Sequence, residues 1–303
     1  MKHVVSVSIG SSKRDHKARA EFLGEEFIIE RIGTDGDIDK AISLIKELDG
    51  KVDAFGMGGT DLYLTTGSRR YLIRDAAKIL KAAQKTPMVD GGGLKNILEY
   101  RAVKYLAREK GMDFRGKRVL ITAAVDRYGM ALAFDEEGAR LVMADLVFAL
   151  KIPLPFRTMR QLRIAASILA PIIVRLPFKM LYPTGSEQEK TDSESSKLWK
   201  YYQEADIIGG DFLFIRRHMP PSLPGRIIVT NTVTAADIEF LRQRGIRTLV
   251  TTTPELEGRS FGTNVMEAVM VALLQKPLAE IKRQDYEDLI DRMGLVPRIV
   301  ELN

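Results

Sequence analysis

One stretch of the sequence has the residue types and order of a dinucleotide-binding site. An apolar strand is expected at residues 118–123, followed by a turn and a helix at about 127–137. Such a turn aims the amides of the helix amino terminus at a pyrophosphate. Asp145, at the end of the next strand, either accepts a hydrogen bond from an adenosine ribose or caps the helix that follows. The chemistry predicted here is nucleotide binding, with Thr122 and Ala123 at the strand end.

The turn departs from the usual glycine pattern. Its three glycine positions hold Ala124, Asp126 and Gly129. A carboxylate at position 126 would repel a pyrophosphate and compete for the helix-terminal amides. Either Arg127 offsets that charge, or Asp126 caps the helix of a domain that binds a different ligand. The pattern predicts a Rossmann-like fold and leaves two interpretations of its ligand.

Small and polar residues follow three further apolar strands, expected near 206–208, 227–229 and 248–250. Ligands of open parallel sheets lie beyond the carboxyl ends of the strands, which favours a ligand crevice here over ordinary loops. The candidates for cofactor contacts are Gly209, Asp211, Asn231, Thr232 and Thr252. Asp145 favours NAD, but Arg140 beside it leaves NAD and NADP both open.

Strand and helix patterns alternate along the first hundred residues as well, which indicates a mainly parallel sheet. The expected strands are 4–9, 26–32, 52–55 and 87–89, and the expected helices are 38–48, 71–83 and the linking helix 94–111. The fold class predicted is α/β, with an amino-terminal α/β substrate domain and a Rossmann-like, doubly wound parallel-sheet domain.

The domain boundaries follow from this pattern. Residues 1–98 form the substrate domain, to which 280–303 return, and 99–279 form the nucleotide-binding domain. The second domain carries a helical insert at 146–183, rich in apolar and basic residues. A polar surface loop is expected at 184–196.

Composition excludes several classes of protein. The 303 residues are 45% hydrophobic and 28% charged, as in ordinary globular proteins. The absence of cysteine excludes disulfides and thiolate chemistry, and the amino terminus lacks a signal-peptide pattern, so a cytoplasmic location is expected. A net charge of +6 comes from interspersed signs and predicts no nucleic-acid partner. The apolar stretch 164–174 is shorter than the roughly 20 residues of a membrane span, so no transmembrane segment is expected.

Two segments and a closing helix together resemble one known family. Residues 89–94 (VDGGGL), a linking helix and 116–121 (GKRVLI) resemble the junction between the two domains of shikimate and quinate 5-dehydrogenases. Residues 258–268 (GRSFGTNVMEA) resemble the final loop and helix of that family. The order of parts covers most of the chain, although close motif matches cover only these stretches.

The resemblance implies hydride transfer between NAD(P) and a hydroxyl of a small polyhydroxy acid. It places Asp90 in a catalytic aspartate–lysine pair, where Asp90 is otherwise a turn residue. The family's lysine motif is absent, because the equivalent stretch 56–62 (GMGGTDL) contains no lysine. Lys13, from another strand end, is the substitute.

The same resemblance suggests substrate contacts. Ser11 and Ser12 resemble the serine pair that holds the substrate carboxylate, and Asn264 is a candidate for substrate hydroxyls. Gly58 lies in a glycine cluster after a strand, which either cradles an anion or is a plain turn. The three histidines lack paired spacing, so no metal site is expected.

The leading hypothesis is a cytoplasmic NAD(P)-dependent oxidoreductase that resembles shikimate/quinate dehydrogenase. An alternative from another class is a non-catalytic nucleotide-binding or sensing protein, which the missing lysine and Asp126 favour. The insert keeps open an acyl or amino-acid reductase, or a helix lying on a membrane surface, although packing on the sheet or in a homodimer interface is preferred. The substrate is not identified by the sequence.

Overall fold

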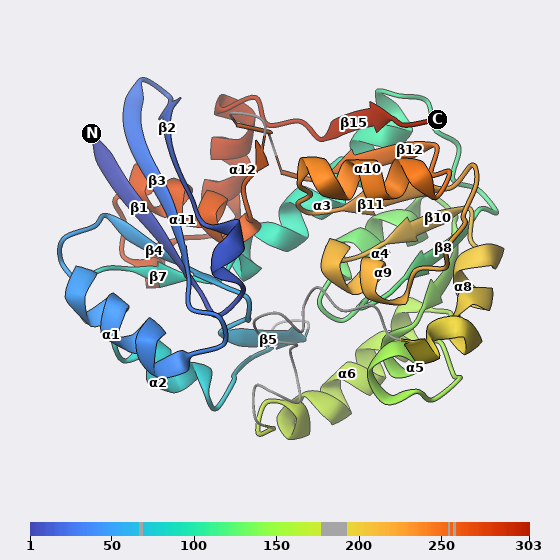
Figure 1. Cartoon of the computed structure of the whole chain (residues 1–303), viewed down its shortest axis with the longest axis horizontal. Coiled ribbons are helices and arrows are strands. Elements are labelled where there is room, and N and C mark those ends of the chain that lie inside the picture. Colours follow the sequence, from blue (N-terminus) through green and yellow to red (C-terminus); the bar gives the residue numbers. More distant parts are fainter. Residues whose placement is uncertain (67–68, 177–192, 254, 257–258) are drawn as a thin grey trace. The chain divides into compact units, whose positions relative to one another are not determined.

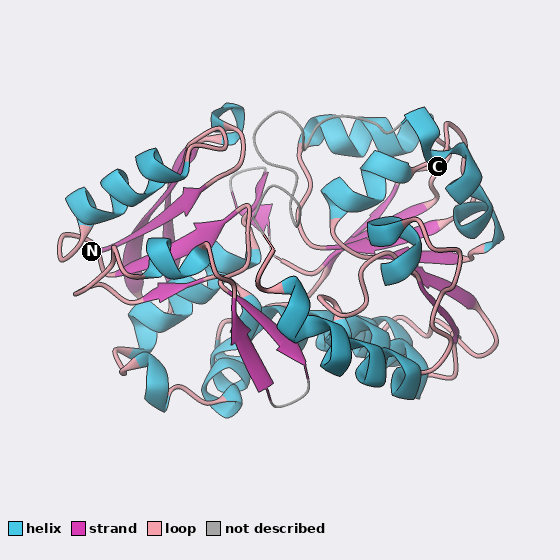
Figure 2. Cartoon of the chain, turned by 90° about the horizontal axis from the view of Figure 1, so that it is seen from below, coloured by secondary structure: helices cyan, strands magenta, loops and turns pink. Residues whose placement is uncertain are grey.

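A computed structural model describes residues 1–66, 69–176, 193–253, 255–256 and 259–303. The chain divides into two compact units, which are described separately. Unit 1 contains the described residues of Met1–Leu94, Ile168–Gln188 and Gly262–Leu295, and unit 2 contains those of Lys95–Ser167, Glu189–Phe261 and Val296–Asn303. The predicted α/β fold class is confirmed, with helices beside both sheets (Figure 2). Residues 177–192, which include parts of the predicted insert and surface loop, lie outside the described residues.

Unit 1 is built on a five-stranded sheet in the order β2-β3-β1-β4-β7 (Figure 1). All neighbours are parallel except β2, which pairs antiparallel with β3. The strands are β1 (Lys2–Ser8), β2 (His16–Phe22), β3 (Glu25–Gly33), β4 (Ala54–Gly58) and β7 (Met88–Val89). The helices are α1 (Ile38–Leu48), α2 (Ala76–Leu80), α11 (Thr263–Leu274) and α12 (Arg283–Arg292), with short helices η1 (Ser12–Arg14) and η4 (Leu278–Glu280).

Alternation along β1 explains how this sheet is covered. Val5 and Val7 are fully buried in a core that includes Ala41 and Ile45 of α1. Ser6, between the two valines, points to the other face, where it accepts a hydrogen bond from the Asn264 amide of α11 at 2.8 Å. The period of two in a strand therefore places an apolar core on one face and a polar contact on the other.

Two sequence expectations fail in unit 1. Strand β2 was not expected, and the helix predicted at 71–83 begins later, with α2. Tyr71 and Leu72 instead belong to β6 (Arg69–Leu72), which pairs antiparallel with β5 (Tyr63–Thr66). The apolar spacing that suggested a helix is thus shared between a strand and a short helix, which periodicity alone does not separate.

Unit 2 is built on a six-stranded sheet in the order β15-β12-β11-β10-β8-β9. Five strands are parallel, and β15 pairs antiparallel with β12 at the edge. The strands are β8 (Arg118–Ile121), β9 (Arg140–Met143), β10 (Ile207–Gly209), β11 (Ile227–Thr230), β12 (Thr248–Thr251) and β15 (Arg298–Glu301). The helices are α3 (Gly92–Arg108), α4 (Tyr128–Glu136), α5 (Asp145–Leu150), α6 (Met159–Ile173), α8 (Trp199–Glu204), α9 (Phe212–His218) and α10 (Ala235–Gln243), with η3 (Ser193–Leu198) before α8 and a strand pair β13 (Glu255–Leu256) and β14 (Arg259–Ser260). Residues 92–94 of α3 and 168–173 of α6 belong to unit 1.

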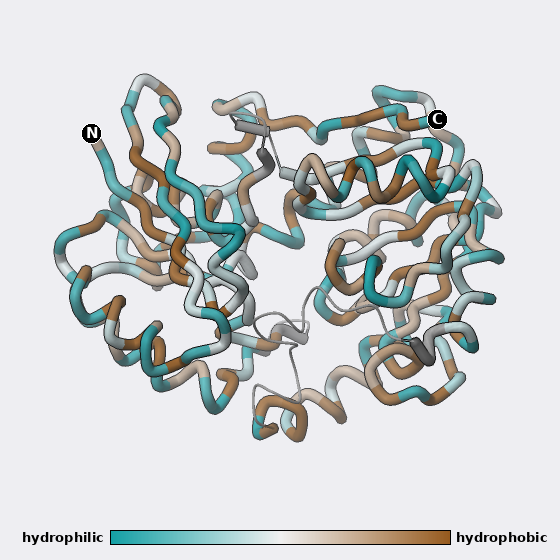
Figure 3. The backbone as a smooth tube through the Cα atoms, in the orientation of Figure 1, coloured by the Kyte–Doolittle hydropathy of each residue, from teal (hydrophilic) through white to brown (hydrophobic). Residues whose placement is uncertain are grey.

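Both faces of the unit 2 sheet are buried, as the strand compositions predict. Along β8, Val119 and Ile121 belong to a core with Phe134 of α4, whereas Leu120 belongs to a second core with Phe212 of α9. Figure 3 shows apolar colour along most of these strands. Parallel strands buried on both faces read as continuous apolar runs, which is the doubly wound arrangement.

The chain returns to unit 1 after β14 and leaves it again before the carboxyl terminus. Gly262–Leu295 belongs to unit 1, whereas Val296–Asn303 belongs to unit 2 and supplies its edge strand β15. The strand has no alternation of large apolar residues, and all of its residues are partly or fully exposed. Edge strands of this kind leave little pattern in a sequence.

Candidate functional site

The candidate site lies at the carboxyl ends of β8 and β10 in unit 2. With β9 on one side of β8 and β10 to β12 on the other, the strand order reverses between β8 and β10. At such a switch point the connections leave the sheet in opposite directions, which opens a crevice where ligands bind. The loop after β8 carries Asp126 and Arg127, and the loop after β10 carries Asp211.

A single guanidinium organises the carboxylates at this point. Arg127, with a side chain 5% exposed, forms ion pairs with Glu99, Asp126 and Asp211. The contacts to Asp126 and Asp211 are both 3.2 Å. The Glu99 side chain is 1% exposed, whereas those of Asp126 and Asp211 are 31% and 34% exposed. Arg127 therefore holds one carboxylate in the interior and two at the surface.

The pKa shifts follow from this geometry. Burial acts to lower the pKa of Arg127, but the charges of Glu99, Asp126 and Asp211 outweigh it and raise that pKa above its ordinary value. Burial raises the pKa of Glu99, against the opposing effects of Arg127 and Lys95. Arg127 is thus a permanent cation at the centre of the cluster.

Helix α3 supplies residues that the sequence analysis did not select. Lys95 forms an ion pair with Asp126, and Glu99 lies one helical turn later on the same helix. The spacing of four places both on one side of α3. Two oppositely charged residues four apart on this helix were the available signal, although the same pattern also occurs on solvated helix faces.

Asp211 and Asn231 join the strand ends to each other. One oxygen of Asp211 accepts hydrogen bonds from the amides of Leu213 and Phe214 at the start of α9. Its other oxygen accepts one from the Asn231 side-chain amide at 2.8 Å. The Asn231 oxygen in turn accepts from the Phe212 amide at 3.2 Å. These contacts fix the orientation of both side chains at the carboxyl ends of β10 and β11.

The predicted pyrophosphate turn is occupied by the protein's own side chains. Asp145 accepts a hydrogen bond from the Val125 amide at 2.9 Å, and the Asn96 side chain accepts one from the Gly129 amide at 2.8 Å. Burial raises the pKa of Asp145 to about 6. Asp145 therefore closes the turn after β8, which differs from the predicted contact with a ribose.

The other predicted cofactor residues of unit 2 are mainly packing residues. Thr122, Ala124 and Thr252 are buried, and the Thr122 and Thr252 amides bond to neighbouring strands. A side-chain carbon on Gly129 would lie 2.1 Å from the Asn96 carbonyl oxygen, and one on Gly209 would lie 2.6 Å from the Met130 sulfur. Both glycines thus allow α4 to approach its neighbours. Ala123 and Thr232 are half-buried after the carboxyl ends of β8 and β11.

Asp90, in unit 1, has a structural environment. One oxygen accepts hydrogen bonds from the amides of Leu62 and Tyr63, at 2.7 and 3.2 Å, and the other accepts one from the Gly92 amide at 2.8 Å. The carboxylate anchors a loop and the start of α3. Across the described residues, no hydrogen bond or ion pair joins Asp90 to Lys13.

The predicted substrate residues of unit 1 also make internal contacts. The Ser11 hydroxyl accepts from the Lys13 amide, and the Ser12 amide donates to Asp35. A side-chain carbon on Gly58 would lie 3.3 Å from the Asn264 amide nitrogen. Gly58 and Asn264 therefore meet, and the glycine makes room for α11.

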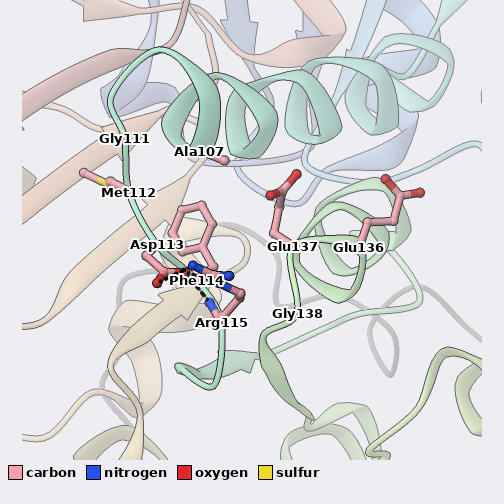
Figure 4. A pocket seen from close by; sticks show the side chains of 9 residues that line it. All are labelled: Ala107, Gly111, Met112, Asp113, Phe114, Arg115, Glu136, Glu137 and Gly138. Carbon is pink, nitrogen blue, oxygen red and sulfur yellow. Dashed lines mark hydrogen bonds and ion pairs between the residues drawn. The ribbon is translucent and has the colours of Figure 1, made fainter.

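A surface depression of about 500 Å³ lies elsewhere in unit 2, at the amino ends of β8 and β9 (Figure 4). Asp113 and Arg115 form an ion pair in its wall, with side chains 63% and 82% exposed. Such exposed pairs are mobile and solvated. The described parts of the chain contain no group of three or more His, Asp or Glu side chains placed to hold a metal ion.

Family comparisons cover most of the chain. Residues 93–302 match the family model described as Domain of unknown function (DUF8754), and residues 3–90 match Domain of unknown function (DUF8753). No curated protein sequence matches the chain.

Solved structures give remote likenesses. An ABC transporter periplasmic solute-binding protein from Actinobacillus succinogenes, described with bound D-allose, is 12% identical, with 99% of this chain and 98% of that chain covered and a TM-score of 0.36. A glucose-galactose binding protein from Geobacillus stearothermophilus is 12% identical, with 99% and 97% covered and a TM-score of 0.41. Hetero-hexameric glutamate dehydrogenase from Thermus thermophilus is 15% identical, with 97% and 73% covered and a TM-score of 0.43. Likenesses at these scores carry no argument about ligand or activity.

These findings correct the family expected from the sequence. The matching family models are two domains of unknown function, which together cover residues 3–90 and 93–302. The expected membership of the shikimate and quinate dehydrogenases is therefore wrong. Around Asp90 and Asn264, glycines admit close backbone contacts, since a side-chain carbon on Gly91 would lie 2.7 Å from the Asn264 backbone nitrogen.

The expected oxidoreductase activity is also corrected, and the geometry gives the physical reason. Amides of the turn and of α4 are bonded to Asp145 and Asn96, and Asp90 is bonded to three backbone amides. Binding of NAD or NADP, a cytoplasmic location and a homodimer stay predictions. Throughout the described segments, no helix has both the length and the apolar character needed to cross a membrane.

Proposed function

We propose that this chain, which belongs to the family described as Domain of unknown function (DUF8754), binds a small, neutral, hydroxyl-rich molecule. The site is the crevice between the carboxyl ends of β8 and β10. The observation that carries the proposal is the pair of partly exposed carboxylates, Asp126 and Asp211, held at this switch point by the buried Arg127. Catalysis is not part of the proposal.

The charges at the crevice select the class of ligand. The exposed groups are carboxylates, which accept hydrogen bonds, while the cations Lys95 and Arg127 lie behind them with side chains 9% and 5% exposed. A phosphate or carboxylate ligand would meet two negative charges first. Hydroxyl groups donate to carboxylates, and neighbouring hydroxyls of a sugar or polyol match two acceptors presented together.

The surrounding contacts reduce the loss of side-chain entropy when a ligand binds. Arg127 fixes one end of both carboxylates, and Asn231 and the amides of α9 fix Asp211 further. Side chains that are already held in one rotamer lose little entropy when a ligand arrives. The cations also neutralise most of the carboxylate charge, so a neutral ligand is favoured over a strongly cationic one.

The test is calorimetric titration of the whole chain with D-ribose, D-glucose and glycerol at millimolar concentrations. Asp126→Asn and Asp211→Asn each replace an acceptor oxygen with a donor and are expected to weaken binding about tenfold or more. Asp113→Asn is the matched control, because this exposed carboxylate also pairs with an arginine but lies at the opposite edge of the sheet.

Saturable binding that weakens in both crevice variants and not in Asp113→Asn would support the proposal. The proposal is overturned if none of these molecules binds, or if the crevice variants bind as the parent chain does. Saturable binding of NADH in the absence of binding by the hydroxyl-rich probes would also overturn it.

A further inference from the structure

Helix α6 and the loop before it form a long segment that contains basic residues and no acids. Residues 151–176 contain five lysine or arginine residues and no aspartate or glutamate. Over the full length, basic and acidic residues are nearly balanced, 46 against 40. The local excess of positive charge is thus a property of this segment and not of the average composition.

One face of α6 is buried in the protein. Met159 and Leu162 are 6% and 1% exposed and belong to a core of unit 2. Ala166 and Ala170 continue the same face at 8% and 1% exposed. The spacing of three or four residues is that of a helix lying against a core.

The opposite face of α6 is apolar and exposed. Ile164, Ile168 and Ile172 follow one another at intervals of four and are 52%, 63% and 59% exposed. Figure 3 shows the apolar colour along this helix. A helix that already buries one apolar face gains nothing in water from a second one, so a row of exposed isoleucines indicates a contact with another surface.

Large apolar side chains are also exposed in the chain just before α6. Leu150, at the end of α5, is 58% exposed, and Ile152 and Leu154, in the loop before α6, are 43% and 63% exposed. The loop closes on the sheet of unit 2 through paired backbone bonds between Met143 and Phe156. Six large aliphatic side chains are therefore exposed within one short stretch of chain.

Arginines accompany the isoleucine row. Arg160 precedes Ile164 by one helical turn, Arg163 lies beside it, and Arg157 and Arg175 lie just outside the two ends of α6; all four are exposed. Within the described ranges, no ion pair is formed by any of these four side chains. Arginines in this position reach headgroup phosphates while their stems lie along apolar groups.

We propose that α6 and its preceding loop dock on an anionic lipid surface. The exposed isoleucines enter the boundary between headgroups and acyl chains, and the four arginines contact anionic headgroups, as in helices that lie in the plane of a membrane interface. The charge pattern disfavours a second copy of this chain on the same face. Two copies would bring like charges together with no acid in either segment to offset them.

The test is co-sedimentation of the full chain with vesicles. Binding is expected to vesicles of phosphatidylcholine and phosphatidylserine at roughly two to one, and not to pure phosphatidylcholine. Binding should weaken in high salt because the headgroup attraction is screened.

Variants distinguish vesicle binding through this surface from nonspecific adsorption. Ile164→Gln with Ile168→Gln is expected to reduce the vesicle-bound fraction about tenfold or more, and Arg160→Gln with Arg163→Gln to reduce the preference for anionic vesicles. Leu278→Gln is the control, since Leu278 is also exposed, at 40%, but lies on η4. Circular dichroism of each variant should match that of the parent chain, because the altered side chains face solvent.

The proposal is overturned if the parent chain binds neutral and anionic vesicles equally, or binds neither. It is also overturned if the isoleucine variants bind as the parent does. A concentration-dependent dimer in analytical ultracentrifugation that the isoleucine variants abolish would assign this face to a second copy and would equally overturn it.

Discussion

The two units end their central strands in opposite ways. In both sheets the strand order reverses beside the first parallel strand, between β1 and β4 in unit 1 and between β8 and β10 in unit 2. The unit 1 edge is filled by α11, since a side-chain carbon on Gly56 would lie 2.8 Å from the Asn264 carbonyl oxygen. The unit 2 edge presents the carboxylates of Asp126 and Asp211. Small residues at a strand end thus leave room either for a ligand or for another part of the chain.

The same contrast extends to the buried acids of the two units. Glu99 in unit 2 and Glu267 in unit 1 are 1% and 4% exposed. Glu99 is paired with Arg127, whereas Glu267 accepts a hydrogen bond from the Tyr286 hydroxyl at 2.9 Å. Burial, with a smaller effect of the Asp90 charge, raises the pKa of Glu267 to about 7. One unit buries an ion pair and the other buries an acid that is protonated over much of the accessible pH range.

The largest effect on stability is expected from breaking the ion pair between Glu99 and Arg127. Arg127→Met leaves Glu99 buried without its cation and should lower the free energy of unfolding by about 3–5 kcal/mol, measured by urea denaturation. Adding Glu99→Leu to Arg127→Met should recover part of that loss. Arg115→Met, in an exposed pair, is the control and should leave stability unchanged. Equal midpoints for Arg127→Met and the control would show that the cluster contributes nothing to stability.

The pH dependence of stability tests the raised pKa of Glu267 in unit 1. The pKa of Glu267 is raised from 4.5 to about 7 in the folded chain. Its contribution to the free energy of unfolding is therefore complete below pH 4.5 and is lost as pH rises to about 7. The loss amounts to about 3 kcal/mol. Glu267→Gln should remove this part of the pH dependence, so that the variant gains stability relative to the parent as pH rises. Parallel stability curves for the two chains over this range would contradict the assignment.

The smallest difference is expected between two glycines that allow close backbone contacts, Gly129 in unit 2 and Gly56 in unit 1. A side-chain carbon at position 129 would lie 2.1 Å from the Asn96 carbonyl oxygen, closer than the 2.8 Å between position 56 and the Asn264 carbonyl oxygen. Gly129→Ala should cost about 1–3 kcal/mol of stability by overpacking, and Gly56→Ala somewhat less. Thermal unfolding of both variants measures the order. A larger loss for Gly56→Ala would show that the backbone of unit 2 relaxes more easily.

Part of the candidate site was accessible from the sequence. Asp126, Arg127, Asp211 and Asn231 follow apolar strands, and the rule that ligands lie beyond parallel strand ends selects such positions without coordinates. Lys95 and Glu99 were missed because they lie on the linking helix, and their spacing of four also suits a solvated face. The sequence left two roles for Asp145, a ribose contact or a helix cap, because it cannot show that the carboxylate accepts a hydrogen bond from the Val125 amide.

The sequence by itself determined the α/β class, the strands of the doubly wound sheet and the basic, acid-free character of the segment at 151–176. These depend on local periodicity and composition, which one chain carries in full. The tertiary structure alone decided which strand end is filled and which is open. That outcome depends on contacts between residues far apart in the chain, such as Gly56 with Asn264 and Arg127 with Asp211. Short motifs do not encode such contacts, because a glycine that admits a ligand and a glycine that admits a helix are the same letter.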